Sequence, residues 1–198
     1  MNLLQEIVNK RTPKTLHNLI GSISQRFSPR VFSSHRIPDK HLEIIFEAAR
    51  LAPSGRNNQP WFYYWIKKGS RLYKKLESCI PERNSWAFSA PLIIIACYDQ
   101  TDSIDKINKW AKYDLGASVI SIILQAQELG YYCRQIGTFD SNKTKDVFNI
   151  PQSLNPFILI AIGRIGTDDD YQKSDKEIIK KELLPWNRKK KIDRELTA

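Results

Sequence analysis

Ala52-Pro53-Ser54-Gly55-Arg56-Asn57-Asn58-Gln59-Pro60-Trp61 is the most informative stretch of this chain. It follows an amphipathic helix and leads directly into the aromatic run 62–66, which we expect to be a strand. Two prolines, a glycine and two asparagines predict an ordered connection that is not helical. Small and amide-bearing side chains in one loop allow a backbone to approach a planar, polar ligand closely. The loop is therefore a first hint of function.

Composition narrows the class of protein. The chain has 198 residues, of which 41% are apolar and 26% charged, as in a globular protein with one substantial core or at most two small ones. It contains no 18-residue apolar run, so we expect no membrane span, and its first residues do not resemble a secretory signal. Cys79, Cys97 and Cys133 are scattered, which argues against disulfides or a zinc site and favours a cytoplasmic location.

The net charge of +10 is concentrated near the two ends of the chain. Residues 1–36 hold six Lys and Arg against one Glu, and residues 171–198 hold nine against five acids, whereas the middle is nearly balanced. Such charge is compatible with a nucleic-acid surface, a phosphate site or solvated tails. For Arg26 and Arg30 we weigh a phosphate site at least as heavily as a tail. No known nucleic-acid-binding signature accompanies the charge, so we do not expect nucleic acid as a partner.

The chain is predicted to alternate helices and strands. Apolar spacing predicts helices over 13–25, from an Asp39 N-cap to about 52, over 69–79, from about 104 to 129, from an Asp140 or Ser141 cap to 148, and over 174–184. Strands are expected over 62–66, 91–98, 131–139 and 155–163, the second of them central and buried on both faces.

The helix predicted for 104–129 is apolar nearly all round in its middle. Such a helix is buried on most sides, either in a core or at a subunit interface. Gly116, Ala117 and Ser118 are small enough to let another backbone pack closely, and Gly130 is placed to end the helix.

Several kinds of chemistry are excluded by the sequence. It has no glycine-rich dinucleotide fingerprint, no P-loop and no nucleophile elbow. His17, His35 and His41 lack metal-ligand spacing, and the cysteines lie in apolar contexts typical of buried, inert thiols. The side chains thus offer no obvious acid, base or nucleophile, which points to a bound organic cofactor.

Four segments follow one another along the chain. They are Arg26-Phe27-Ser28-Pro29-Arg30-Val31-Phe32, the stretch Ala52 to Trp61, Ala90-Pro91 leading into the strand that ends at Asp99, and Asp114-Leu115-Gly116-Ala117 together with Ile136-Gly137-Thr138-Phe139-Asp140. In this order they resemble the nitroreductase family of FMN-dependent oxidoreductases. The Pro-Ser-to-Trp motif is specific, and the others gain weight from their order and spacing.

The resemblance implies where FMN would bind. Arg26, Phe27, Ser28 and Arg30 match the segment that holds the phosphate and ribityl chain, and a guanidinium fork suits two phosphate oxygens. Pro53, Ser54, Gly55, Asn57 and Gln59 match the loop that reaches or supports the flavin from a second subunit. Gly137 and Thr138 match the segment near flavin N5, and Arg83 or Asn84 would lie near the pyrimidine. The C-terminal cation that the family places against the phosphate is left open among Lys173, Lys176, Arg188 and Lys189.

The resemblance also implies an activity and an assembly. It implies a homodimeric enzyme in which FMN accepts hydride at N5 from NADH or NADPH and passes it to an electron-poor small molecule, such as a nitroaromatic or a quinone, by a ping-pong mechanism. No catalytic side chain and no metal are expected. Two alternatives stay open: a non-catalytic, basic nucleic-acid-binding or interaction protein on the same scaffold, and a flavoenzyme of different chemistry, such as reductive dehalogenation.

The expected fold is α+β and nitroreductase-like, with a central mixed or antiparallel sheet flanked by helices. We divide the chain into an N-terminal helical extension, 1–24, a core domain, 25–166, and a basic C-terminal extension, 167–198. Both extensions are expected to contact a partner subunit.

Overall fold

The structure is a computed structural model that describes residues 2–101 and 107–185. Its centre is a four-stranded sheet in the order β1-β2-β4-β3, made of β1 (Trp61–Lys67), β2 (Leu92–Asp99), β3 (Tyr132–Ile136) and β4 (Leu154–Gly163). All three neighbouring pairs are antiparallel. The predicted α+β class with an antiparallel sheet is confirmed, and so is the central, buried position of β2.

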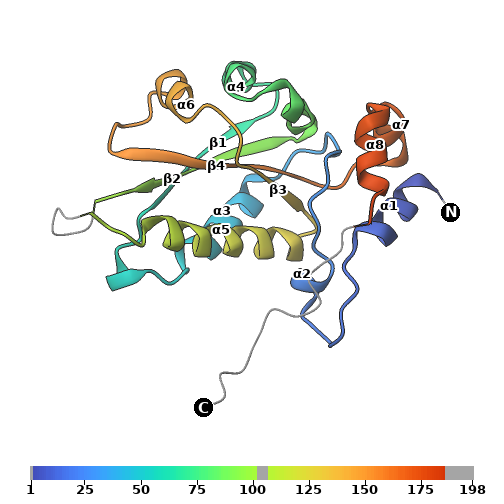
Figure 1. Cartoon of the computed structure of the whole chain (residues 1–198), viewed down its shortest axis with the longest axis horizontal. Helices are drawn as coiled ribbons and strands as arrows, with labels where there is room; N and C mark the ends of the chain where they lie inside the picture. Colours follow the sequence, from blue (N-terminus) through green and yellow to red (C-terminus); the bar gives the residue numbers. More distant parts are fainter. Residues whose placement is uncertain (1, 102–106, 186–198) are drawn as a thin grey trace, which may run out of the picture.

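Helices cover both faces of the sheet (Figure 1). One face packs against α3 (Asp39–Arg50) and α5 (Ala111–Glu128), which share one hydrophobic cluster with it. The other face packs against α4 (Arg71–Leu76), η2 (Glu77–Cys79), η3 (Glu82–Ser89) and α6 (Ser141–Phe148), in a second cluster. The long β-branched run of β2 fits this position because a strand buried on both faces needs no polar alternation.

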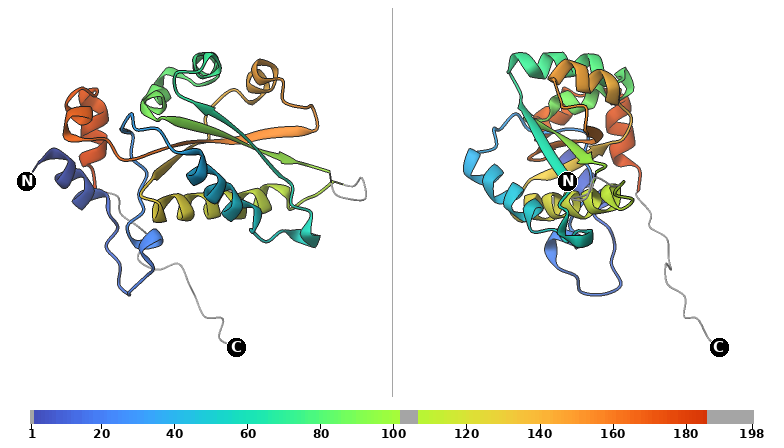
Figure 2. Two further views of the ribbon diagram at one scale, coloured as in Figure 1. Left: turned by 180° about the vertical axis from the view of Figure 1, so that it is seen from behind. Right: turned by 90° about the vertical axis from the view of Figure 1, so that its left-hand side faces the viewer.

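The two ends of the described chain pack together. Helix α1 (Leu3–Arg11) contacts α7 (Asp168–Gln172) and α8 (Lys176–Leu183) at one end of the sheet (Figures 1 and 2). Their shared core consists of Ile7, Val31 and Tyr171. The described part of the predicted C-terminal extension thus packs on its own N-terminal helix, and residues 186–198 lie outside the described residues.

The prediction of a helix over 13–25 is wrong. The N-terminal helix lies earlier, at α1, and only a single turn, α2 (Gly21–Ser24), forms within the predicted range. The apolar residues that suggested the helix are Leu16, Leu19, Ile20 and Ile23, and all four are exposed. These side chains therefore have no core surface of the same protomer to pack against, and helices in proteins depend on such packing.

Other helix ends agree or shift by a few residues. Asp39 is the first residue of α3 rather than its N-cap, a position that Pro38 occupies without a side-chain cap. Helix α5 begins at Ala111, later than predicted, and residues 102–106 lie outside the described part. Asp140 caps α6 by accepting a hydrogen bond from the Lys143 N–H. Gly130 follows α5 with φ of +77°, as the C-terminal glycine prediction requires.

Candidate functional site

The turn at residues 26–30 lies between the N-terminal segment and β3. Phe27 is buried and packs its ring against Tyr132 of β3, with 4.9 Å between centroids. The Ser28 carbonyl oxygen accepts hydrogen bonds from Arg134 Nη1 at 2.5 Å and from Arg11 Nη2 at 3.5 Å. Phe27 therefore fixes the turn to β3, and the hydrogen bonds to the Ser28 carbonyl oxygen hold the Arg11 and Arg134 side chains beside the turn.

Arginines gather around this turn. Arg26 Nη1 donates to Ser28 Oγ at 3.5 Å, and Arg30 pairs with the fully buried carboxylate of Glu182 in α8 at 2.8 Å. The Arg134 guanidinium lies over the Trp86 ring, 4.9 Å from its centroid. We call Arg11, Arg26, Arg30 and Arg134 the arginine cluster.

Electrostatics in the arginine cluster favour an added anion. Burial, followed by the neighbouring positive charge of Arg30, lowers the pKa of the Arg134 guanidinium to about 10, and Glu182 offsets part of that effect. A phosphate dianion beside Arg30 and Arg134 would relieve this repulsion, and guanidinium groups hold phosphate oxygens in bidentate geometry.

The end of β3 lies beside η3. Asn84 Nδ2 donates to the Thr138 carbonyl oxygen at 3.2 Å, and Trp86 Nε1 donates to Asn84 Oδ1 at 3.3 Å. Trp86 in turn carries Arg134 on its ring, so these contacts connect Thr138 to the arginine cluster. Arg83 is exposed next to Asn84.

Gly137 leaves its immediate surroundings open. A Cβ built on it would meet only the Ile158 side chain, at an ordinary 3.7 Å. A hollow of about 370 Å³ lies next to it, lined by Ser78, Cys79, Ile80, Pro81, Thr138, Phe139 and Asp140. A ligand can therefore approach the backbone at the end of β3.

The loop at residues 53–60 has an unusual backbone. Arg56, Asn57 and Gln59 have φ of +54°, +58° and +46°, a left-handed region that costs free energy for residues other than glycine. Ser54 Oγ accepts a hydrogen bond from the Gln59 N–H at 3.0 Å, and Gln59 Nε2 donates to the Asn57 carbonyl at 3.2 Å. The loop is thus built by its own amides and hydroxyl, and Gln59 supports it from within.

One buried carboxylate fixes the loop to α5. The Gly55 N–H donates to Asp114 Oδ2 at 3.1 Å, and the Trp110 side chain lies 3.7 Å from the position of a Cβ on Gly55. Pro53 and Asn57 remain exposed. The contacts hold the loop and leave four of its five predicted ligand-binding residues exposed, since Gly55 and Gln59 are exposed as well.

The predicted site residues form two groups, and only one of them, the loop at 53–60, lies at an end of α5 (Figure 1). The loop lies at the N-terminal end of the helix, near Asp114, whereas Arg26 lines a hollow of about 390 Å³ with Ile120 and Leu124, further along it. The first group holds Arg26, Phe27, Ser28, Arg30, Arg83, Gly137 and Thr138, and the second holds Pro53, Ser54, Gly55, Asn57 and Gln59. A single protomer does not bring the two groups together.

An apolar surface runs between the two groups. Along α5 it includes Tyr113, which is 77% exposed, and Ile120, which is 44% exposed. Gly116 lies on the same face and would accommodate a Cβ with no heavy atom within 4 Å. Ser118, in contrast, faces the core and donates to the Ala49 carbonyl oxygen.

The sequence matches the model of the nitroreductase family over residues 23–82 and 80–164. This chain belongs to the nitroreductase family. The family prediction is confirmed, and the match covers both groups of predicted site residues.

Two curated relatives of this nitroreductase family chain are archaeal. A putative NADH dehydrogenase/NAD(P)H nitroreductase of Archaeoglobus fulgidus is 27% identical over 164 residues, 81% of this chain and 92% of the relative. A protein of Methanothermobacter thermautotrophicus with the same description is 26% identical over 153 residues, 74% of this chain and 76% of the relative.

Solved structures share the nitroreductase fold. An oxidoreductase containing FMN superposes with a TM-score of 0.79 at 24% identity, covering 88% of this chain and 89% of that one. A putative nitroreductase in complex with FMN from Desulfovibrio desulfuricans gives a TM-score of 0.65 at 23% identity, covering 78% and 90%. The predicted nitroreductase-like fold is confirmed.

Three members of the site were missed from the sequence. Arg11, Arg134 and Glu182 come from α1, β3 and α8 and meet around the turn at 26–30. The signal for Arg134 was a charged residue within a short apolar strand. Nothing local marked Glu182, since its partner Arg30 is 152 residues away.

Other predicted chemistry can be checked against the described residues. In residues 2–101 and 107–185, no group of three or more His, Cys, Asp or Glu side chains could hold a metal ion. No helix in that part of the chain is long and apolar enough to span a membrane. All three cysteines are free and buried, and burial raises the pKa of the Cys97 and Cys133 thiols to about 12.

Proposed function

We propose that this chain is an FMN-dependent oxidoreductase that takes hydride from NADH or NADPH and delivers it to an electron-poor small molecule, such as a nitroaromatic or a quinone. The arginine cluster beside the open end of β3 is the observation that carries the proposal. Bound FMN would supply hydride transfer at its N5 atom. The protein supplies binding, orientation and charge, which agrees with a site that has few acid–base groups.

The chain's own residues have separate tasks in this proposal. Arg26, Ser28 and Arg30 would hold the phosphate and ribityl chain, and Glu182 fixes the direction of the Arg30 guanidinium. Gly137 and Thr138 would present backbone to the flavin ring, and Asn84 holds Thr138 in place. Arg83, exposed beside Asn84, would face the pyrimidine edge, where a positive group stabilises negative charge.

A second copy of the chain would complete the site. The loop at 53–60 contacts α5 at Asp114, and Arg26 lies near Ile120 and Leu124. These positions are about 9 to 15 Å apart at 1.5 Å per residue, so the loop and the turn at 26–30 are held apart within one protomer. A two-fold pair that buries the α5 surface would bring the loop of one copy to the turn of the other. The exposed apolar residues Tyr113, Ile120, Leu16 and Ile20 support such a pair, because large apolar patches mark interfaces.

The test combines flavin binding with reduction. Titration of the protein with FMN, followed by flavin fluorescence, should show saturable binding, and anaerobic addition of NADH or NADPH should bleach the flavin absorbance band. Arg26→Ala should weaken FMN binding on the order of tenfold or more, since a charged phosphate contact is lost. Arg71→Ala, an exposed arginine on α4, serves as the control and should bind normally.

The proposal would be contradicted by a folded protein that takes up no FMN. Tight, salt-sensitive binding of nucleic acid by that same flavin-free protein would favour the basic binding-protein alternative.

A further inference from the structure

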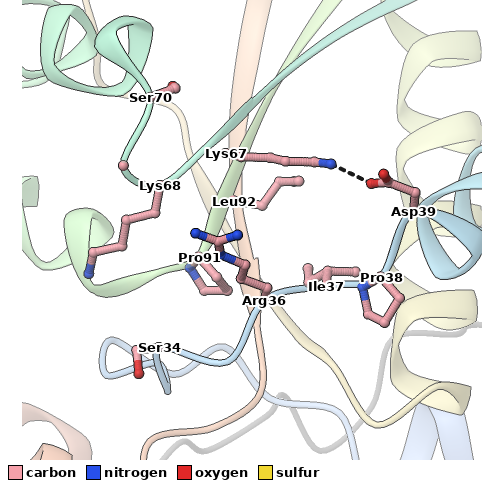
Figure 3. A pocket seen from close by; sticks show the side chains of 11 residues that line it. Ser34, Arg36, Ile37, Pro38, Asp39, Lys67, Lys68, Ser70, Pro91 and Leu92 are labelled. Atoms are coloured by element: carbon pink, nitrogen blue, oxygen red, sulfur yellow. Dashed lines mark hydrogen bonds and ion pairs between the residues drawn. The ribbon is translucent and has the colours of Figure 1, made fainter.

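A pocket of about 660 Å³ lies outside the proposed flavin site, where the end of β1 meets the start of α3 (Figure 3). It is lined by Ser34, Arg36, Ile37, Pro38, Asp39, Lys67, Lys68, Gly69, Ser70, Pro91 and Leu92. Its volume is within the range that small-molecule sites occupy.

The pocket is positively charged. Among its lining residues are three cations and one acid, and that acid, Asp39, is already paired with Lys67. Lys68 lines the pocket, and its Nζ donates to the carbonyl oxygen of Ser89 in η3 at 3.2 Å. Arg36 makes no hydrogen bond or ion pair within the described residues, and Figure 3 shows its guanidinium between Pro91 and Lys67, directed into the hollow. Within the part of the chain that the structure describes, the charges of Arg36 and Lys68 thus have no counter-ion.

The surroundings strengthen the attraction for an anion. Ile37, Pro91 and Leu92 form a buried apolar floor, and charges interact more strongly beside low-dielectric walls than in bulk water. The N-terminus of α3 opens onto the same hollow, and no side chain caps it. The positive end of the helix dipole therefore adds to the charges of Arg36 and Lys68.

The pocket is distinct from the arginine cluster. It lies at the β1 edge of the sheet, whereas Arg134 lies on β3 at the opposite edge. Three inter-strand spacings separate these edges, about 14 Å in total. Lys68 comes closer to the turn at 26–30, because Ser89 accepts a hydrogen bond from Lys68 Nζ and donates its hydroxyl to the Arg30 carbonyl oxygen at 3.3 Å. The Arg30 side chain itself pairs with Glu182 and does not line the pocket. A single small ligand at one site would leave the other site free.

We propose that this pocket is a second anion site, which binds the phosphate group of a small phosphate monoester. Arg36 and Lys68 hold the dianion, and the organic part lies against Pro38 and the apolar floor. A dianion matches the two uncompensated charges better than a carboxylate, which carries only one, and a guanidinium fork fits phosphate oxygens.

The test is an NMR titration of the FMN-loaded protein, at constant ionic strength, with inorganic phosphate, phenyl phosphate and benzoate. Amide signals of Lys68, Gly69 and Ser70 report on the pocket, and those of Ser28 and Arg30 report on the arginine cluster. We expect saturable shifts at the pocket with both phosphates, phenyl phosphate binding more tightly, and benzoate binding at least about tenfold more weakly.

Variants separate the pocket from general surface charge. Arg36→Ala should weaken phosphate binding about tenfold. Asp39→Asn should tighten it, because it removes a competing negative charge and releases Lys67, and a misfolded variant would not produce such a gain. Lys143→Ala removes one exposed charge on α6, away from the pocket, and should bind as the wild type does.

Three results would overturn the proposal. One is a linear, unsaturated response of the pocket amides. Another is an Arg36→Ala variant that binds phosphate as tightly as the wild type. The third is benzoate binding equal to phenyl phosphate, which would show that the pocket does not select a dianion.

Discussion

The turn at 26–30 and the loop at 53–60 are both predicted to reach the cofactor, yet they are held in place by different means. The turn depends on side chains from far along the chain, Arg11, Arg134 and Glu182. The loop depends on its own hydrogen bonds and on a single buried carboxylate, Asp114. The turn is thus a tertiary feature, whereas the geometry of the loop is largely local.

The largest effect is expected at the tertiary support of the turn. Glu182→Ala leaves Arg30, whose side chain is only 16% exposed, without its carboxylate. Removing one partner of a buried pair should cost about 3 kcal/mol of unfolding free energy. Urea unfolding of the variant and the wild type measures this cost.

A matched control lies on the same helix. Glu177 pairs with Lys180, and both side chains are more than half exposed. Glu177→Ala should therefore change the unfolding free energy by less than about 0.5 kcal/mol. Equal losses for the two glutamate variants would show that the turn has no special dependence on Glu182.

The carboxylate that holds the loop should matter less. Asp114→Ala removes the acceptor of the Gly55 N–H, and we expect a loss of about 1 kcal/mol, because the exposed amide can bond to water instead. The loop itself should become more susceptible to limited proteolysis. Glu128→Ala, an exposed change on the same helix, should do neither, and an unaltered cleavage pattern in Asp114→Ala would contradict the role given to this residue.

A smaller change separates loop geometry from ligand contact. Asn57 has φ of +58°, and glycine adopts this conformation without strain. Asn57→Gly should leave the unfolding free energy within about 0.5 kcal/mol of the wild type, while FMN affinity falls because the amide side chain is gone. Unchanged FMN affinity would remove Asn57 from the site.

The buried thiols provide a pH-dependent reference for the core, although Cys133 lies on β3 next to the turn at 26–30. Burial raises the pKa of Cys97 and Cys133 to about 12 from an ordinary value of 9.0, so both thiols stay protonated in the folded protein near pH 8. A thiol reagent should label neither until the protein is unfolded. In the unfolded chain the thiols ionise near their ordinary pKa of 9.0, whereas in the folded protein they ionise only near 12. Their contribution to stability is therefore complete below about pH 9 and declines as the pH rises toward 12. Rapid labelling of either thiol in the folded protein would contradict this.

The same contrast explains what the sequence could predict. The strands and the loop were found because β-branched runs, prolines and amides act over a few neighbouring residues. Asp140 and Gly130 marked their helix ends for the same reason. Arg26 and Arg30 were predicted, but Arg11 and Glu182 could not be found, because their contacts with the turn depend on how α1, α7 and α8 pack.

The failed helix at 13–25 has a different cause. Its apolar spacing is real, but Leu16 and Ile20 are 91% and 65% exposed in one protomer. The pattern therefore indicated burial without indicating against which surface. In the proposed pair, these residues would contact the second copy.

The most direct test of the shared site is subunit complementation. Arg26→Ala disables the turn and Asn57→Gly disables the loop, so each variant alone should bind FMN weakly at both sites. After unfolding and refolding together, half of the pairs should be mixed, and each mixed pair should hold one site with both regions intact. We predict that about a quarter of all sites in the mixture then bind FMN with wild-type affinity. No recovery in a mixture that has formed mixed pairs, or a protein that stays monomeric while binding FMN, would contradict the account.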